Sequence, residues 1–321
     1  MTALRAFVIG GAGFIGSHLV DALVRRGPVT VFDDLSVGSR ERIAGPLGDG
    51  TATLVVGDAL DSEALRDAMQ GHDVVFHLAA NPEARWGLER PALDLEQGTV
   101  VTQRVLDAMR VSGVPRFVLA SSGTVYGEAP SACGEMDLGH LPISLYGASK
   151  LACEALASAY AECFDLRGTV LRFGNVVGPR GTHGAALDFL RKLARDGREL
   201  EVLGDGRQAK PYLHVSECVE GILFALDHQS ARFDVWNLAP TGATNVRHIA
   251  ELCVRASPFP DAALRFTGGD RGWRGDVPRS LLCPDKLAAL GFRVTMSSDE
   301  AVARAVEELA EEVFGGAVEP T

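Results

Sequence analysis

The sequence predicts an α/β protein with a doubly wound parallel sheet and a second, smaller mixed α/β domain. Short, continuously apolar runs alternate with helix-like segments up to about residue 178 of the 321-residue chain. Beyond that point the strands become sparse, and stretches such as GPRGTHG and LGDGRQAKP are rich in glycine and charge. Continuous apolar strands separated by helices are typical of a parallel sheet that is covered on both faces.

The predicted elements follow one another in a regular order. Strands are expected at residues 4–10, 29–34, 52–58, 73–79, 116–122 and 168–175, and VWNLA predicts a returning strand at 235–239. Helices are expected at residues 14–27, 61–71, 91–113 and 145–164, and a loop with a short helix follows residue 34. The returning strand indicates that the division into domains is discontinuous.

Composition excludes several classes of protein. The net charge is −11 without a basic cluster, which argues against a nucleic-acid partner. No apolar run approaches the ~20 residues of a membrane span, so no membrane association is expected. The six cysteines show no C-x-x-C spacing and the eight histidines no H-x-x-x-H pattern, so neither a metal site nor a disulfide framework is expected. This cysteine usage predicts a reducing, cytoplasmic setting.

The turn after the first strand carries a phosphate-binding pattern. Gly10, Gly13 and Gly16 stand in G-x-x-G-x-x-G spacing between the first strand and the first helix. Glycines allow a tight turn and a close approach of the main chain to a pyrophosphate, and the helix N-terminus adds unpaired N–H groups. Within a βαβ unit this pattern predicts a dinucleotide site.

An acidic residue at the end of the second strand favours NAD over NADP. Asp33 lies where a carboxylate accepts hydrogen bonds from the adenosine ribose and repels a 2′-phosphate. Arg40 is an opposing feature, because a nearby arginine can attract that phosphate. Asp58 follows the third strand, where it is expected to contact the adenine, to cap a helix, or to do both.

The segment SLYGASK places Tyr146 and Lys150 four residues apart, on one face of a predicted helix. An ammonium beside a phenol favours the phenolate, which is a competent general base. Ser122 and Thr124 follow the carboxyl end of the preceding strand, where ligands of such sheets bind. We expect these four residues to act together at one carbon.

The segments GGAGFIG, HLAAN, SSGTVYG, YGASK and RFGNVVGPR resemble those of the extended short-chain dehydrogenase/reductases, the NAD-dependent epimerase/dehydratase family. The chain is most similar to its archaeal and bacterial UDP-galactose 4-epimerases, from about residue 5 to about residue 310. The resemblance implies an NAD-binding Rossmann domain of residues 1–177 plus about 212–240. It also implies a nucleotide-sugar-binding domain of residues 178–211 plus about 241–321.

The resemblance assigns roles to the predicted site. In those epimerases the tyrosine of Y-x-x-x-K takes the proton of the sugar 4-hydroxyl, and hydride leaves carbon 4 for NAD and returns on the other face. Tyr146 is then the base, Lys150 holds the nicotinamide ribose, and Ser122 bonds the 4-oxygen with Thr124 close by. Further NAD contacts are expected from Phe14, Ile15, Asp34, Leu35, Ser36, Asp58, Ala59, Leu78, Ala79 and Ala80.

Substrate contacts follow from the resemblance alone. The expected residues are Arg85, Ser122, Asn175, Leu203, Lys210, Arg274, Asp276 and Ser280. Asn175 and Lys210 would contact the diphosphate, and Lys210 stands where many members have arginine. Ser280 stands at a gate by the hexose, where a small residue admits an N-acetylated sugar.

Alternative activities remain open. A 4,6-dehydratase carries an Asp-Glu pair where this chain has Gly123 and Thr124, and decarboxylases usually keep a glutamate at the second position. A glucuronate epimerase uses an arginine where Thr182 stands, although Arg85 or His183 could replace it. A ketoreductase and a non-catalytic NAD(H)-binding sensor are further alternatives. We also expect a homodimer through the helices that begin near Pro91 and Tyr146, by resemblance.

Overall fold

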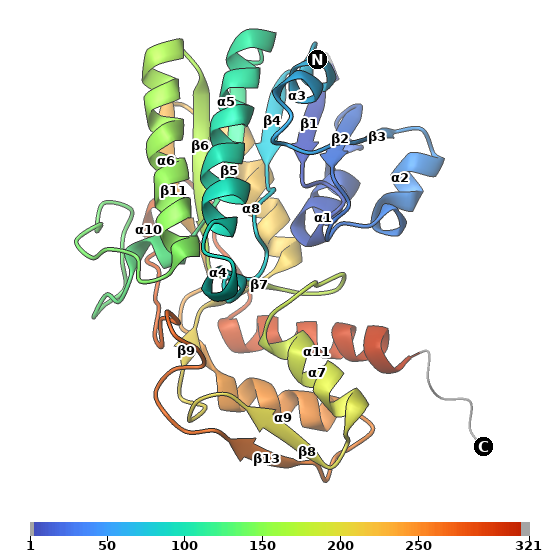
Figure 1. Cartoon of the computed structure of the whole chain (residues 1–321), viewed down its shortest axis with the longest axis vertical. Helices are drawn as coiled ribbons and strands as arrows, with labels where there is room; N and C mark the ends of the chain where they lie inside the picture. Colours follow the sequence, from blue (N-terminus) through green and yellow to red (C-terminus); the bar gives the residue numbers. More distant parts are fainter. Residues whose placement is uncertain (1–2, 316–321) are drawn as a thin grey trace. The chain divides into compact units, whose positions relative to one another are not determined.

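A computed structural model describes residues 3–315 and shows a seven-stranded sheet in the order β11-β6-β5-β4-β1-β2-β3 (Figure 1). Its strands are β1 (Ala6–Ile9), β2 (Val29–Asp33), β3 (Ala52–Val56), β4 (Val74–His77), β5 (Arg116–Ser122), β6 (Arg167–Phe173) and β11 (Phe233–Leu238). β1 pairs in parallel with β2 and β4, β2 with β3, and β4 with β5. The predicted doubly wound α/β fold is confirmed, including the returning strand.

Helices cover both faces of this sheet. One face is covered by α3 (Ser62–Met69), α5 (Val101–Ser112) and α6 (Leu145–Phe164) (Figure 1). The other carries α1 (Phe14–Leu23) and α8 (Val215–His228), and Arg26 in the turn after α1 forms an ion pair with Asp227 near the end of α8 (Figure 1). Because the central strands are apolar on both faces, β1 and β4 are buried along their whole length.

The helix expected from Pro91 begins differently from an ordinary α-helix. Residues Leu95–Val100 form a π-helix that continues into α5. The Ser149 hydroxyl of α6 donates to the Asp94 carbonyl at 2.6 Å, and a Cβ on Gly98 would lie 2.2 Å from that hydroxyl. A side chain that inserts into a helical ladder widens the turn. Gly98 therefore permits a close contact between this segment and α6.

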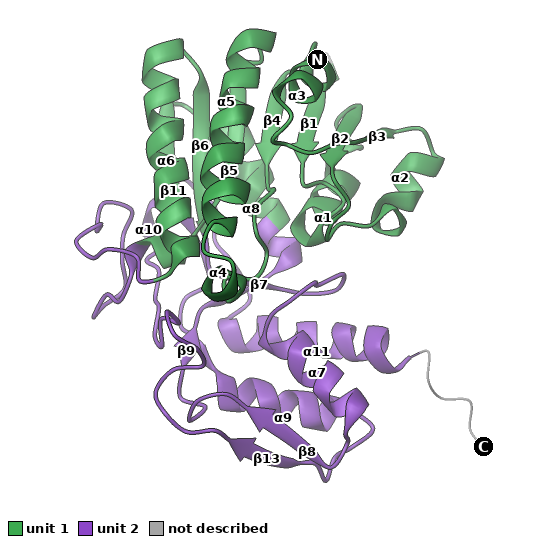
Figure 2. Cartoon of the chain, viewed as in Figure 1, with its two compact units in different colours: residues 1–125, 144–172, 219–236 green, residues 126–143, 173–218, 237–321 purple. Residues whose placement is uncertain are grey.

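The chain divides into two compact units, each built from three segments (Figure 2). Unit 1 comprises residues 1–125, 144–172 and 219–236. Unit 2 comprises residues 126–143, 173–218 and 237–321. Unit 1 contains most of the sheet and its helices.

Unit 2 has a core of its own. α7 (Ala185–Arg195), α9 (Val246–Ala256) and α11 (Ser298–Phe314) pack around buried apolar residues such as Leu190, Ile249 and Val306. Three short strand pairs accompany them: β7 (Asn175–Val177) with β10 (Tyr212–His214), β8 (Glu199–Val202) with β13 (Ala263–Phe266), and β9 (Ala209–Lys210) with β12 (Thr244–Asn245). Three short helices lie in loops: α2 (Ala44–Gly48) and α4 (Trp86–Glu89) in unit 1, and α10 (Asp285–Ala289) in unit 2.

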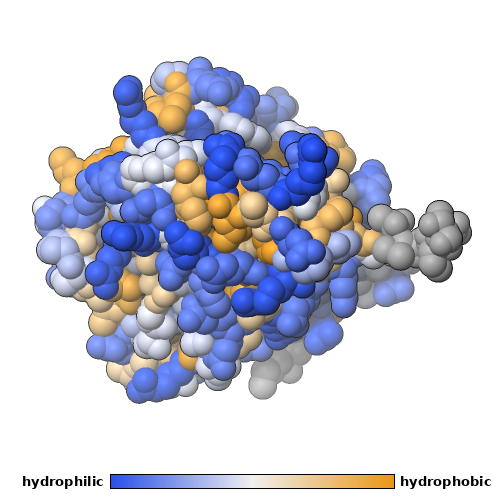
Figure 3. All heavy atoms as spheres, turned by 90° about the horizontal axis from the view of Figure 1, so that it is seen from below, coloured by the Kyte–Doolittle hydropathy of each residue, from blue (hydrophilic) through white to orange (hydrophobic). Residues whose placement is uncertain are grey.

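Hydrophilic side chains predominate on the face drawn in Figure 3, with smaller hydrophobic areas among them. Within residues 3–315, no helix is long and apolar enough to cross a membrane. Over the same residues, no three His, Cys, Asp or Glu side chains gather in a way that could hold a metal ion.

The contact between β5 and β6 generates a stability prediction. A Cβ on Gly168 would lie 1.8–2.3 Å from ring atoms of Phe117. Gly168→Ala is therefore expected to lower the free energy of unfolding by about 1–3 kcal/mol, as overpacking does. Gly48→Ala is the control, because nothing lies within 4 Å of the added methyl group and alanine favours helix by about 0.5–1 kcal/mol. Equal effects of the two substitutions in urea unfolding would contradict this packing argument.

Candidate active site

The glycine-rich turn has the geometry of a phosphate cradle. Gly10 has φ +77°, and a Cβ there would lie 2.8 Å from the Ala79 nitrogen. A Cβ on Gly16 would lie 2.1 Å from the Gly10 carbonyl oxygen. Gly13 caps α1 without a side-chain bond, and the first turn of α1 contains no acidic residue. The N–H groups of the first turn of α1 are thus left for an anionic ligand, and a pyrophosphate fits here.

Asp33 is tied to the same turn. Its carboxylate accepts hydrogen bonds from the Ala12 and Leu35 main-chain nitrogens, each at 2.9 Å, and the residue is 6% exposed. Burial raises its pKa, while these two bonds oppose the shift. An ionised carboxylate has about four acceptor positions, so two remain for ribose hydroxyls. Asp33 therefore stabilises the turn and also keeps the capacity to accept hydrogen bonds from a ribose, as the sequence predicted.

The loop after β2 contains an arginine that sequence reasoning missed. Arg40 is exposed at the start of a 3-10 helix (Arg40–Ile43), whereas the charge of Arg42 acts on Asp33. Arg42 Nη1 donates to the Val37 carbonyl at 3.1 Å. Asp34 is occupied locally, because it accepts bonds from the nitrogen and hydroxyl of Ser36. The sequence indicated that an arginine lies near Asp33, but it pointed to Arg40 and not to Arg42.

Most of the other predicted cofactor residues lie at or just after the carboxyl ends of their strands. Leu78 and Ala79 both donate main-chain bonds to the Ile9 carbonyl, which holds the turn after β4 against β1. Asp58 is exposed and accepts a bond from the Leu60 nitrogen. The helix-cap interpretation of Asp58 is wrong, because the cap of α3 is Asp61. Phe14 and Ile15 open α1, while Ala59 and Ala80 are half-buried in the turns.

The four residues expected at the reacting carbon all lie in unit 1. Tyr146 and Lys150 are one turn apart on α6, and Lys150 Nζ lies 5.7 Å from the centre of the Tyr146 ring. Lys150 is 6% exposed and donates to the Ala120 carbonyl at 2.8 Å. Ser144 caps α6 by accepting a bond from the Gly147 nitrogen. The cap fixes the start of the helix immediately before Tyr146.

Ser122 ends β5 and is held by Thr124. The Thr124 nitrogen and hydroxyl both donate to Ser122 Oγ, at 3.2 and 3.0 Å. A serine hydroxyl has two acceptor positions and one proton. With both acceptor positions taken, Ser122 is left to act as a donor.

A buried polar cluster of His77, Asn81 and Asp94 lies beside Lys150; the HLAAN segment contains the first two, but the sequence did not indicate the cluster. His77 and Asp94 are buried, and the Lys150 charge acts on both. Burial raises the pKa of Asp94, whose Oδ1 accepts a bond from Asn81 at 2.9 Å. Asp94 Oδ2 and His77 Nδ1 have no hydrogen-bond partner among residues 3–315. The Lys150 ammonium is therefore placed within a buried polar cluster.

Most of the predicted substrate residues belong to unit 2. Lys210 and Asp276 form an ion pair, and Asp276 also accepts a bond from the Gly272 nitrogen. Ser280 donates its main-chain N–H to the Ala209 carbonyl, directly before Lys210. The Leu203 carbonyl accepts a bond from Gln208 in the same loop region. The structure thus brings together residues from 203–210 and 271–280.

No hydrogen bond or ion pair given for the described residues links the other predicted substrate residues to Lys210 or Asp276. Asn175 is exposed in β7, where it pairs with Tyr212 of β10. Arg274 is exposed in the loop before Asp276. In unit 1, Arg85 forms an ion pair with Glu83 at 2.8 Å.

Comparison with known proteins identifies the family to which this chain belongs. A profile of the NAD dependent epimerase/dehydratase family matches residues 6–239, which is most of the chain. The chain belongs to this family, as its motifs predicted. The family's cofactor is NAD, which agrees with the glycine cradle and Asp33.

The chain is similar over most of its length to individual nucleotide-sugar epimerases and dehydratases. A UDP-glucose 4-epimerase of Erwinia amylovora is 34% identical over 282 residues, or 79% of this chain and 83% of the relative. A solved UDP-galactose 4-epimerase is 39% identical with a TM-score of 0.87, over 97% of this chain and 100% of its own. The dTDP-glucose 4,6-dehydratase DesIV of Streptomyces venezuelae, solved with NAD and TYD bound, is 27% identical with a TM-score of 0.88, over 99% of each chain.

The buried cluster beside Lys150 generates a prediction on pH. Burial lowers the pKa of His77 to about 3, from 6.5 in the unfolded chain. Below pH 6.5 the unfolded state therefore binds a proton that the folded state does not, and stability is lost as the pH falls. Between pH 7 and pH 5 this linkage amounts to about 2 kcal/mol. His77→Gln should remove that part of the decline in urea unfolding, with exposed His140→Gln as the control. An unchanged pH profile in His77→Gln would refute the neutral, buried histidine.

Proposed function

We propose that this chain is an NAD-dependent 4-epimerase that interconverts UDP-hexoses of the glucose and galactose type through a transient 4-keto sugar. The observation that supports this most strongly is the combination of Tyr146, Lys150 and a donor-only Ser122 in unit 1, which also contains the dinucleotide cradle. A sensor protein would have no need of this combination.

Each residue has a distinct role in the proposed reaction. Tyr146 takes the proton from the sugar 4-hydroxyl and later returns it to the same oxygen. Lys150 uses one of its three N–H groups on the Ala120 carbonyl, so two remain for the nicotinamide ribose. The Ser122 proton is donated to the 4-oxygen, a bond that favours the ketone once the proton has left. When bound, NAD would supply the acceptor for the hydride of carbon 4 and the donor that returns it to the opposite face of that carbon.

The residues after Ser122 argue against a dehydratase. Elimination of water between carbons 5 and 6 requires an acid and a base in addition to the tyrosine. Positions 123 and 124 hold a glycine and a threonine, and the Thr124 hydroxyl is engaged with Ser122. Neither residue can supply that acid–base pair.

The substrate assignment rests on unit 2. We propose that Asp276, Lys210 and Arg274 contact the nucleotide diphosphate and its ribose, and that Ser280 leaves room for an N-acetyl group. The support is the proximity of segments 203–210 and 271–280. A uronate carboxylate would need a cation, and the Arg85 charge is paired with Glu83. This favours a neutral hexose.

A panel assay tests the proposal. Purified protein is incubated without added cofactor with UDP-glucose, UDP-N-acetylglucosamine, UDP-glucuronate and dTDP-glucose, and the products are separated by chromatography. The expected result is 4-epimerisation of a UDP-hexose, with NAD rather than NADP released on denaturation. A 4-keto-6-deoxy product, or preferential turnover of the uronate, would contradict it.

Tyr146→Phe is expected to keep the fold and the bound NAD but to lower kcat by about 10²–10⁴-fold, the usual contribution of a general acid–base group. Tyr160→Phe is the matched control, because Tyr160 lies on the same helix and its hydroxyl accepts a bond from Gln103. If Tyr146→Phe and Tyr160→Phe retain similar turnover, Tyr146 is not the base.

We also propose a homodimer through the outer surfaces of α5 and α6. Leu95, Val111, Leu145 and Phe164 lie on or next to these helices and are 56, 50, 46 and 46% exposed. Apolar side chains at such positions suit an interface between copies of the chain.

Light scattering of the purified protein should give twice the chain mass of 34.0 kDa. The variant Leu145→Arg/Phe164→Arg should shift the mass toward that of one chain, because it places charges within the proposed apolar interface. Val56→Arg, at an exposed apolar residue of β3, is the control and should leave the dimer intact. A wild type of single-chain mass would refute the dimer.

A further inference from the structure

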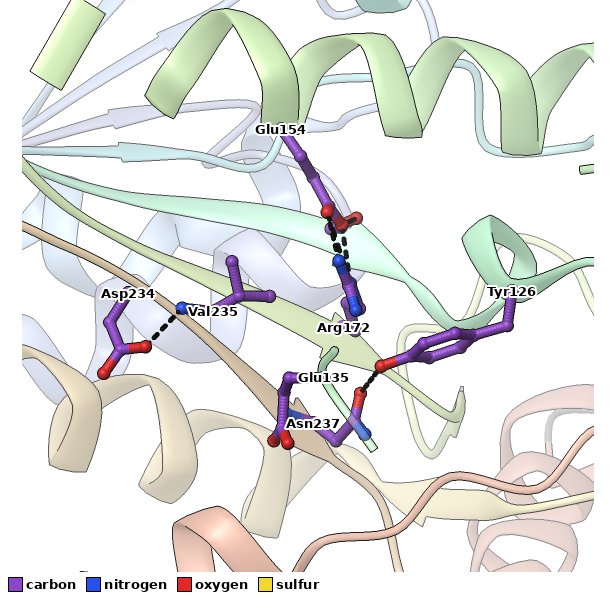
Figure 4. A network of polar contacts seen from close by, with 8 residues as sticks. Tyr126, Glu135, Glu154, Arg172, Asp234, Val235 and Asn237 are labelled. Atoms are coloured by element: carbon purple, nitrogen blue, oxygen red, sulfur yellow. Dashed lines mark hydrogen bonds and ion pairs between the residues drawn. The ribbon is translucent and has the colours of Figure 1, made fainter. Parts of the chain in front are cut away.

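A buried ion pair joins Glu154 of α6 to Arg172 of β6, and the proposed chemistry makes no use of it (Figure 4). Arg172 Nη2 lies 2.6 Å from Glu154 Oε2, and Arg172 Nε lies 3.0 Å from Oε1. The two side chains are only 2% and 6% exposed. Burying two charges has a large desolvation penalty, and replacement by apolar residues is often neutral or stabilising. Stability alone is thus a weak reason for a pair at this place.

The same carboxylate also reaches β5. The Ser121 hydroxyl donates to Glu154 Oε1, and Ser121 directly precedes the candidate catalytic Ser122. One turn earlier on α6, Lys150 donates to the Ala120 carbonyl at 2.8 Å. Two consecutive residues before Ser122 are therefore bonded to α6.

The spacing along the helix connects this contact to the proposed base. Tyr146, Lys150 and Glu154 follow at intervals of four residues, so they lie along one face of α6. Apolar packing is non-directional and lets a helix shift along a sheet, whereas charge-assisted bidentate bonds fix distance and orientation.

We propose that Glu154 and Arg172 are a positioning pair that sets the register of α6 on β5 and β6, and thereby the distance between the Tyr146 and Ser122 hydroxyls. The catalytic consequence rests on the proposed 4-epimerase function. The pair transfers no proton, because Arg172 and Ser121 occupy the Glu154 carboxylate. A reacting group must be held to within about 0.5 Å of its working position, which gives such a pair a direct effect on rate.

The test uses the double variant Glu154→Leu/Arg172→Met, which removes both charges of the pair together. Its Tm and its NAD content are expected to stay close to those of the wild type. Its kcat should fall by about 10²-fold, the effect of a misplacement near 1 Å, with little change in KM. The pH dependence of kcat should keep its position, since no titrating catalytic group is lost.

Two single variants complete the design. Ser121→Ala keeps the ion pair and removes only its bond to β5, so a smaller fall in kcat is expected. Thr169→Val is the matched control: Thr169 is fully buried in β6, and its hydroxyl has no hydrogen-bond partner among residues 3–315. Its kcat should equal that of the wild type. Should the double variant not fold, Ser121→Ala takes its place in both measurements.

Crystal structures of the wild type and the double variant provide a readout that needs no substrate. The distance between Tyr146 Oη and Ser122 Oγ should change by more than about 0.5 Å. If the wild type turns over no UDP-hexose, the proposed function fails, and this distance alone decides on the positioning pair. An unchanged distance, or a folded double variant with wild-type kcat, overturns the inference.

Discussion

The bond between the Lys150 ammonium and the Ala120 carbonyl is the contact on which the proposed chemistry depends. Because Lys150 is only 6% exposed, its ammonium must be compensated, and a carbonyl near the end of β5 provides part of that compensation. The bond places the helix that carries Tyr146 against the strand that ends in Ser122. The remaining N–H groups of Lys150 then have a fixed direction from which to hold a ribose.

The cofactor half of the site follows from a second constraint, the lack of space around the first turn. Gly10 and Gly16 leave no room for a Cβ, so the main chain itself lines the cradle. Asp33 then fixes the turn by accepting the Ala12 N–H, and its burial raises its pKa. One carboxylate thus joins the pyrophosphate turn to the position where a ribose is expected.

The sequence predicted the parts of the fold that rest on local patterns: the strands, the glycine turn and the Tyr146–Lys150 spacing. It did not indicate contacts that depend on tertiary placement. The insertion of Ser149 at the π-helix and the buried Asp94 beside Lys150 join residues more than 50 positions apart in the chain. Asp58 was ambiguous because two aspartates precede α3, and only the fold shows that Asp61 caps it. The proposed substrate contacts of unit 2 stay predictions.

In the proposed reaction, hydride leaves carbon 4 of the sugar and returns to the same carbon. The most direct measurement uses UDP-glucose deuterated at carbon 4, incubated with purified protein and no added nucleotide, with the products analysed by NMR. We expect UDP-galactose that retains the deuterium at carbon 4, with slower turnover than for the unlabelled sugar. Deuterium found at carbon 6, or lost from a product that still forms, would contradict the account.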